Sequence, residues 1–165
     1  MSQQPKNLVE WEPIRAPDLV LGIGTSAGGS EALRALFASL PGETGIAYVV
    51  IALRDADGQP PIVELLAEIT GLPVEEARDG MEVLADHVYV APTDSLVQMA
   101  EGKFQVEPAG NLEHPRGAID TFFYSLAEER QTGAIGILLS GNGTDGTLGL
   151  KAISDFGGMT VVQDP

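Results

Sequence analysis

The chain has no cysteine and only two histidines, His87 and His114. Without cysteine there is no disulfide framework, iron–sulfur cluster, thiolate zinc site or cysteine nucleophile. Two histidines are also too few for a histidine-rich metal site. The sequence therefore predicts a protein without a bound metal.

Basic side chains are scarce as well: nine Lys and Arg stand against 24 Asp and Glu, a formal net charge of −15. Nucleic-acid binding depends on Lys and Arg that neutralise phosphates, so this balance disfavours it, and the same argument disfavours anionic membranes. No apolar run approaches the roughly 20 residues of a membrane span. The N-terminal stretch also lacks the apolar region of a secretory signal.

What is present fits one packed domain: 165 residues, 44 % hydrophobic and 20 % charged. Composition of this kind supports a core and is not typical of disorder. Pro5, Pro13 and Pro17 predict an irregular N-terminal arm over residues 1–17, followed by a domain over 18–165. Because the sequence stops directly after a predicted strand, we expect the domain to lack its final C-terminal segment.

Short apolar runs alternate with amphipathic stretches along the domain. Strands are predicted at Leu19–Gly24, Ile46–Leu53, Val74–Ala77, His87–Ala91, Ala134–Leu139 and Met159–Gln163, with a hairpin of Leu96–Met99 and Lys103–Val106. Helices are predicted at Ser30–Leu40 (with Ser30 as N-cap), Pro61–Thr70, around Ile119–Leu126 and at Thr147–Phe156. The alternation predicts an α/β fold: a doubly wound, mostly parallel sheet with helices on both faces and a small β-hairpin.

The turn after the first strand reads GIGTSAGG over residues 22–29. One interpretation is Gly-x-Ser-x-Gly, in which Ser26 is exposed on a tight turn and backbone N–H groups stabilise an oxyanion. Another is a Gly-x-Gly-x-x-Ala dinucleotide fingerprint, which requires an acid about 20 residues on, whereas Asp55 lies farther away. A third is structural, with glycines that let a helix pack closely on the sheet. The residues alone leave all three open.

A second glycine-rich loop, SGNGTDG over residues 140–146, follows a predicted buried strand and precedes a helix. Ligand-binding residues of parallel sheets gather at the carboxyl ends of the strands, so Asp145 and Ser26 are expected at the same edge. An aspartate there could orient a histidine base. It could equally well cap a helix N-terminus or form an Asx turn.

Four segments together resemble the catalytic domain of chemotaxis-type protein-glutamate methylesterases, the CheB family. They are VLGIGTSAGG, DGMEVLADHVYVAP, IDTFFYSLAEE and LLSGNGTDGTLGLKAISDFGGMTVVQDP. The similarity runs in order over residues 18–165 and is strongest with the branch fused to CheR-type methyltransferase and sensor-kinase modules. The family fold, a doubly wound parallel α/β sheet with a small hairpin, agrees with the fold predicted above.

The resemblance implies a cytoplasmic hydrolase that removes glutamate 5-methyl esters from receptors with a Ser-His-Asp triad and no cofactor. The implied partners are a methylated chemoreceptor or another signalling protein, and other modules of the same polypeptide. The family's nucleophile corresponds to Ser26 and its aspartate to Asp145. The neighbouring oxyanion and loop positions are Thr25, Ala27, Gly28, Gly143 and Thr144.

The third member of the triad is missing. The family's histidine closes the second strand in a Gln-His pair, and the corresponding pair here is Ala52-Leu53. Leucine cannot accept the proton that a serine must lose to become a nucleophile. Loss of one triad member leaves only residual catalysis. The resemblance therefore implies an impaired or inactive domain, a pseudoenzyme, with Leu53 between Ser26 and Asp145 at the sheet edge.

Two alternatives remain. An active methylesterase would need a relocated base, and His114 is the candidate because it precedes a crossover helix that starts near the carboxyl edge. His87 begins its strand and is therefore expected at the opposite, amino edge. A nucleotide-binding α/β domain is a remote alternative, disfavoured by the ordered similarity.

Overall fold

The structure is a computed structural model that describes residues 15–25, 29–53, 61–110, 117–139 and 145–164. Its main sheet is built from β1 (Leu19–Thr25), β2 (Ile46–Ala52), β3 (Val74–Glu76), β4 (Val88–Val90), β7 (Ala134–Leu138) and β8 (Met159–Val162). A separate hairpin consists of β5 (Ser95–Ala100) and β6 (Lys103–Pro108). The helices are α1 (Ser30–Ser39), α2 (Ile62–Ile69), α3 (Ala118–Arg130), α4 (Thr147–Asp155) and the short 3-10 helix η1 (Gln131–Gly133).

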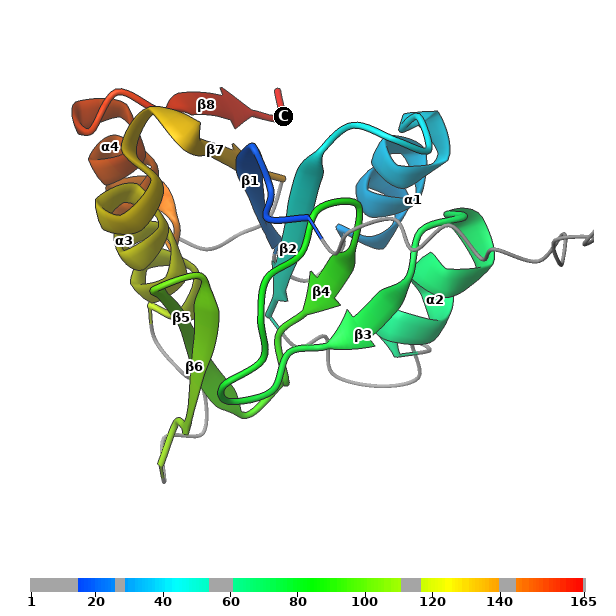
Figure 1. Ribbon diagram of the computed structural model, residues 1–165, viewed down its shortest axis with the longest axis horizontal. Coiled ribbons are helices and arrows are strands. Elements are labelled where there is room, and N and C mark those ends of the chain that lie inside the picture. The colour runs from blue at the N-terminus through cyan, green and yellow to red at the C-terminus, as the bar shows by residue number, and fades with distance from the viewer. Residues whose placement is uncertain (1–14, 26–28, 54–60, 111–116, 140–144, 165) are drawn as a thin grey trace, which may run out of the picture.

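Within the described residues, the main sheet has six parallel strands in the order β3-β4-β2-β1-β7-β8. The helices α1 and α2 lie on one face, whereas α3, α4 and the antiparallel hairpin lie on the other (Figure 1). The predicted α/β fold, with helices on both faces and a small hairpin, is thereby confirmed.

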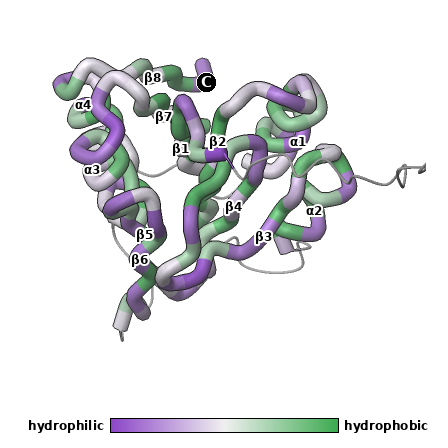
Figure 2. The backbone as a smooth tube through the Cα atoms, viewed as in Figure 1, coloured by the Kyte–Doolittle hydropathy of each residue, from purple (hydrophilic) through white to green (hydrophobic). Residues whose placement is uncertain are grey.

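The central strands carry hydrophobic residues along most of their length (Figure 2). In β2, the consecutive residues Tyr48, Val49 and Val50 are all fully buried. A continuous buried run is expected when a parallel strand is covered by helices on both faces. Alternate side chains of β2 therefore join two different cores, with Tyr48 packed on the α1 side and Val49 on the α3 side.

Glycines in β1 allow α3 to pack directly against the sheet. A Cβ atom placed on Gly22 would lie 3.0 Å from the ring of Phe122 and 3.0 Å from the ring of Phe123. Both rings are fully buried, so they fill the space that a side chain at Gly22 would need. The structural interpretation of the first glycine-rich segment therefore holds at Gly22.

The chain leaves the two neighbouring strands β1 and β7 toward opposite faces. The helix after β1 is α1, which buries Leu33 and Phe37 in one core. The helix after β7 is α4, which contributes Leu150 and Ile153 to the other core. The boundary between β1 and β7 is therefore the topological switch point, where open α/β sheets form their ligand-binding crevice.

The start of α1 differs from the prediction. The helix begins at Ser30 itself, and Gly29 occupies the N-cap position with right-handed backbone angles of φ −81° and ψ 0°. The chain thus enters the helical conformation one residue before Ser30. The prediction that Ser30 is the N-cap is wrong for this reason.

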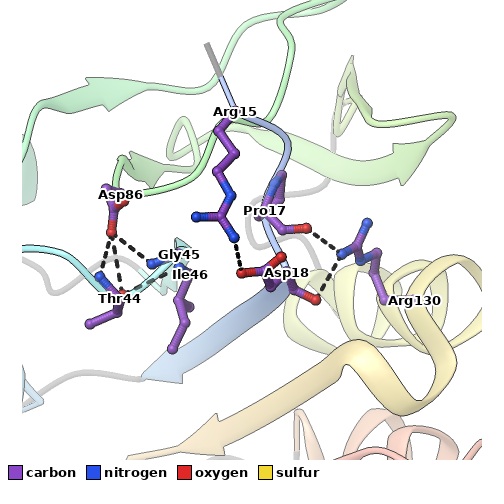
Figure 3. A network of polar contacts seen from close by, with 8 residues as sticks. All are labelled: Arg15, Pro17, Asp18, Thr44, Gly45, Ile46, Asp86 and Arg130. Atoms are coloured by element: carbon purple, nitrogen blue, oxygen red, sulfur yellow. Dashed lines mark hydrogen bonds and ion pairs between the residues drawn. The ribbon is translucent and has the colours of Figure 1, made fainter. Parts of the chain in front are cut away.

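The amino edge of the sheet is held by a polar network (Figure 3). The carboxylate of Asp86 accepts hydrogen bonds from the backbone N–H groups of Thr44 (2.8 Å) and Gly45 (3.0 Å). At the end of α3, Arg130 donates to the carbonyl oxygens of Pro17 (2.7 Å) and Asp18 (3.2 Å). The entry of the chain into β1 is therefore fixed to α3.

Replacement of Arg130 by Met is expected to lower the free energy of unfolding by about 1–2 kcal/mol, because hydrogen bonds from a charged donor to two carbonyls are lost. Arg15→Met is the matched control. Arg15 forms an exposed ion pair with Asp18, so its loss should cost less than about 0.5 kcal/mol. Urea unfolding measures both values, and equal losses for the two variants would contradict the anchoring role.

Candidate active site

The carboxyl ends of three neighbouring strands are joined by hydrogen bonds. The backbone N–H of Leu53 donates to the carbonyl oxygen of Thr25 (2.8 Å), and that of Leu139 donates to the carbonyl oxygen of Gly24 (2.9 Å). The ends of β2, β1 and β7 therefore form one continuous edge with β1 in the middle. Thr25 is 2 % exposed. Ser26 follows Thr25 and lies outside the described residues, as do Ala27 and Gly28.

The strand order places Leu53 relative to the end of β1. The structure places Leu53 at the same edge as the end of β1, but β1 lies between β2 and β7. The expectation that Leu53 lies between Ser26 and Asp145 stays a prediction, because Ser26 lies outside the described residues; what the structure shows is that β1 itself stands between β2 and β7. The reason is that the sheet grows outward from β1 in both directions, so β2 and β7 pair with its opposite sides.

The side chain of Leu53 packs toward the face covered by α3. Leu53 is partly buried and contacts the core cluster that contains Val49 and Ile51 of β2. This follows from the alternation along an extended strand, which sends residues 49, 51 and 53 to the same face. The same cluster contains Ile119, at the start of α3. Position 53 therefore faces the layer in which Asp145 is held.

Asp145 caps the N-terminus of α3. One carboxylate oxygen accepts the backbone N–H of Ile119 (3.0 Å) and the other accepts that of Asp120 (2.9 Å). The first N–H groups of a helix have no partner within the helix, and a carboxylate is also favoured there by the helix dipole. The capping interpretation of Asp145 is thus realised, although on α3 and not on the helix that follows it.

Asp120, in the first turn of α3, caps the N-terminus of α4 in the same way. Its Oδ1 atom accepts the backbone N–H groups of Gly146 (3.0 Å) and Gly149 (2.7 Å). The two carboxylates are therefore exchanged between the two helix starts: Asp145, which precedes α4, caps α3, and Asp120, which belongs to α3, caps α4. Sequence reasoning missed Asp120. The only available signal is an acid in the first turn of a predicted helix, and the partner on a distant segment cannot be inferred from spacing.

The pKa of Asp145 is raised above its ordinary value of 3.8. Burial is the largest cause, because a charged carboxylate is less well solvated inside the protein. The hydrogen bonds from the backbone N–H groups of Asp120 and Ile119 act in the opposite direction and lower it. The nearby carboxyl group of Asp120 raises it again.

A raised pKa makes the stability contributed by Asp145 depend on pH. The native state binds this proton more tightly than the unfolded chain, so the contribution is complete below pH 3.8 and is lost as pH rises through the native pKa. The unfolding free energy of the chain should therefore fall relative to that of Asp145→Asn as pH rises from 3.8. Urea unfolding at a series of pH values tests this, and a difference independent of pH would contradict it.

Of the two histidines, the structure describes His87. His87 lies at the amino edge, where its carbonyl oxygen accepts the backbone N–H of Tyr48 (3.0 Å) and its ring stacks on Tyr89. It is thus at the far edge from Leu53, as expected. His114 lies outside the described residues, and so do Gly143 and Thr144.

The described residues contain neither a candidate metal site nor a helix that could span a membrane. No group of three His, Cys, Asp or Glu among them could hold a metal ion. None of the helices in this part of the chain has the length and apolar character to cross a bilayer.

The sequence and the structure of this chain were found to be similar to those of one protein family. The family model described as CheB methylesterase matches residues 21–165. A "protein-glutamate methylesterase/protein-glutamine glutaminase 3" from Burkholderia orbicola (strain AU 1054) is 39 % identical over 158 residues, which cover 92 % of this chain and 45 % of that protein. A "putative protein-glutamate methylesterase/protein-glutamine glutaminase" from Leptospira interrogans (serovar copenhageni) is 32 % identical over 144 residues, which cover 87 % of this chain and 75 % of that protein.

A solved structure of a CheB domain has a similar fold. The crystal structure of the CheB methylesterase catalytic domain of Thermotoga maritima superposes with a TM-score of 0.73 at 27 % sequence identity, over 86 % of this chain and 77 % of that chain. The chain spans 45 % of the length of the Burkholderia relative. The family match over residues 21–165 and the similarity to the Thermotoga maritima structure together show that this chain belongs to the CheB methylesterase family.

Proposed function

We propose that this domain carries a protein-glutamate methylesterase site that lacks its general base and is therefore impaired or inactive. In the complete reaction, the hydroxyl oxygen of Ser26 attacks the ester carbonyl of a methylated glutamate, and methanol leaves. Water then hydrolyses the acyl-enzyme and regenerates the serine. The names of the relatives also include a glutaminase activity, in which ammonia leaves in place of methanol. The proposed substrate is a methylated chemoreceptor or another signalling protein.

One observation carries the proposal: the position that closes β2 holds a leucine. Leu53 is hydrogen-bonded through its backbone to Thr25, the residue before the proposed nucleophile. Its side chain packs on the face where α3 and α4 begin. A general base must lie within hydrogen-bond reach of the proton that it removes, and an alkyl side chain at this place has no atom to receive it. Ser26 then stays a neutral alcohol.

The setting of Asp145 supports the same proposal. Two backbone N–H groups hold its carboxylate in one orientation, 3.0 Å and 2.9 Å away. In a Ser-His-Asp triad, a carboxylate fixed in this way accepts the Nδ1–H of the histidine and stabilises the imidazolium. The support for the base is thus in place, whereas the base itself is absent from position 53.

Methanol release from a methyl-esterified receptor fragment tests the proposal. The unchanged chain should release methanol no faster than Ser26→Ala, because the first has no base at position 53 to activate the serine and the second has no serine nucleophile at all. Release that clearly exceeds that of Ser26→Ala would contradict the proposal.

The same assay decides the alternative with a relocated base. If His114 replaces the missing histidine, release by the unchanged chain should exceed that of Ser26→Ala and be lost in His114→Gln. Membership in the CheB family argues against the remote alternative, a nucleotide-binding domain.

The wider context of the domain is also a proposal. Because the chain matches only 45 % of the Burkholderia relative, further modules of the same polypeptide are expected as partners. The CheR-type methyltransferase and sensor-kinase modules, and the cytoplasmic location, stay predictions.

A further inference from the structure

We propose that Asp120 is a positioning residue for Asp145, and that the exchange of the two carboxylates between α3 and α4 sets where the triad carboxylate stands. The proposal rests on the proposed function in assigning Asp145 to the triad. The electrostatic effect of Asp120 on Asp145 can be tested separately from hydrolysis.

Neither helix provides its own cap. The residues before α3 and α4 are Gly117 and Gly146, which have no side chain and adopt left-handed φ angles of 77° and 103°. The carboxylate of Asp145 supplies the acceptor for α3, and that of Asp120 supplies the acceptor for α4. The four hydrogen bonds are 2.7–3.0 Å long. Movement of one helix start therefore moves the carboxylate that caps the other.

The two helix starts are also in tight contact. A Cβ atom on Gly146 would lie 2.7 Å from Leu138 and 2.9 Å from Ile119, and one on Gly149 would lie 3.1 Å from the Cα of Asp120. Tightly packed interiors have few voids, so the pair has little room to slide. The position of the Asp145 carboxylate is therefore defined by both helices, and not only by the loop to which Asp145 belongs.

Asp120 has an electrostatic effect besides its geometric one. Among the described residues, Asp120 is the charged side chain that acts on the carboxyl group of Asp145 and raises its pKa. On α4, Lys151 is paired with Asp155 on the exposed surface. A carboxylate with a higher proton affinity is a better acceptor for the N–H of a histidine. Asp120 thus both fixes Asp145 and increases its basicity.

The first test measures the titration of the Asp145 carboxyl group by carbon-13 NMR in the full chain. Asp120→Asn keeps an oxygen that can accept the N–H groups of Gly146 and Gly149 but removes the charge. We expect the midpoint of Asp145 to shift to lower pH in this variant. Asp86→Asn is the matched control, because Asp86 also accepts two backbone N–H groups but lies at the amino edge. Equal midpoints in the two variants would overturn the proposal.

The second test measures turnover in a Leu53→His background with a methyl-esterified receptor fragment. Asp120→Ala is expected to lower kcat by about 10- to 100-fold with little change in KM, because Asp145 is displaced. Asp120→Asn should recover most of that loss and shift the acidic limb of the pH–rate profile. An unchanged kcat in Asp120→Ala would overturn the proposal, and if that variant does not fold, Asp120→Asn decides through its pH profile. If Leu53→His is itself inactive, the proposed function fails, while the NMR titration still decides the role of Asp120.

Discussion

Leu53→His is expected to raise the rate of methanol release by about 10²- to 10⁴-fold, the usual contribution of a positioned general base. The site already supplies what that base needs. The backbone of residue 53 is held at the end of β1, and its side chain faces the layer of α3. A fixed carboxylate, Asp145, is hydrogen-bonded at the start of the same helix. The assay is methanol release from a methyl-esterified receptor fragment at neutral pH.

Two controls make this result specific. Leu53→Gln places a polar side chain of similar size at the edge but no proton acceptor of suitable pKa, so it should leave the rate at background. Addition of Ser26→Ala to Leu53→His should abolish the gain, because the nucleophile is removed. Equal rates for the His and Gln variants, or release that survives Ser26→Ala, would show that position 53 is not the place of the base.

Gly24→Ala is expected to lower the free energy of unfolding by about 1–3 kcal/mol, the usual cost of inserting a methyl group into a packed core. The new Cβ atom would lie 2.5 Å and 3.1 Å from two atoms of Ile119 and 3.2 Å from Leu138. Ile119 is buried and donates its backbone N–H to Asp145. The substitution should therefore loosen the site as well as the fold.

Gly71→Ala is the matched control for Gly24→Ala. A Cβ atom on Gly71 would have no neighbour within 4 Å among the described residues. Its effect on the unfolding free energy should stay within about 0.5 kcal/mol. Urea unfolding compares the two alanine variants. In the Leu53→His background, Gly24→Ala should also reduce kcat, whereas Gly71→Ala should not. Equal stability of the two variants would contradict the close packing of α3 on β1.

The fold could be predicted largely from local patterns, because burial on both faces produces them. The continuous apolar run of β2 follows directly from its place between two helical layers. The ends of elements were harder to predict. Ser30 is a residue type that favours the N-cap position, but the backbone of Gly29 is already helical, and this property of the backbone is not visible in residue types.

The candidate site was only partly predictable, for a physical reason. The sequence places Asp145 and Leu53 in loops and strand ends that share one edge, but it does not say on which side of β1 a later strand pairs. The position of β7 opposite β2 is set by tertiary packing, which the local patterns along the chain do not report. The role of Asp120 was missed for the same reason. Hydrogen bonds between segments far apart in the chain leave no periodic signal.

The role of position 53 can be tested without a substrate. The claim is that position 53 is the vacant place of the base, facing Asp145. Nitrogen-15 NMR of the new imidazole in Leu53→His measures its pKa, and the unchanged chain identifies the signals of His87 and His114. We predict a pKa that is higher with the ionised carboxylate of Asp145 present than in Leu53→His combined with Asp145→Asn, because an opposite charge nearby favours the imidazolium. The same pKa in both proteins would contradict it.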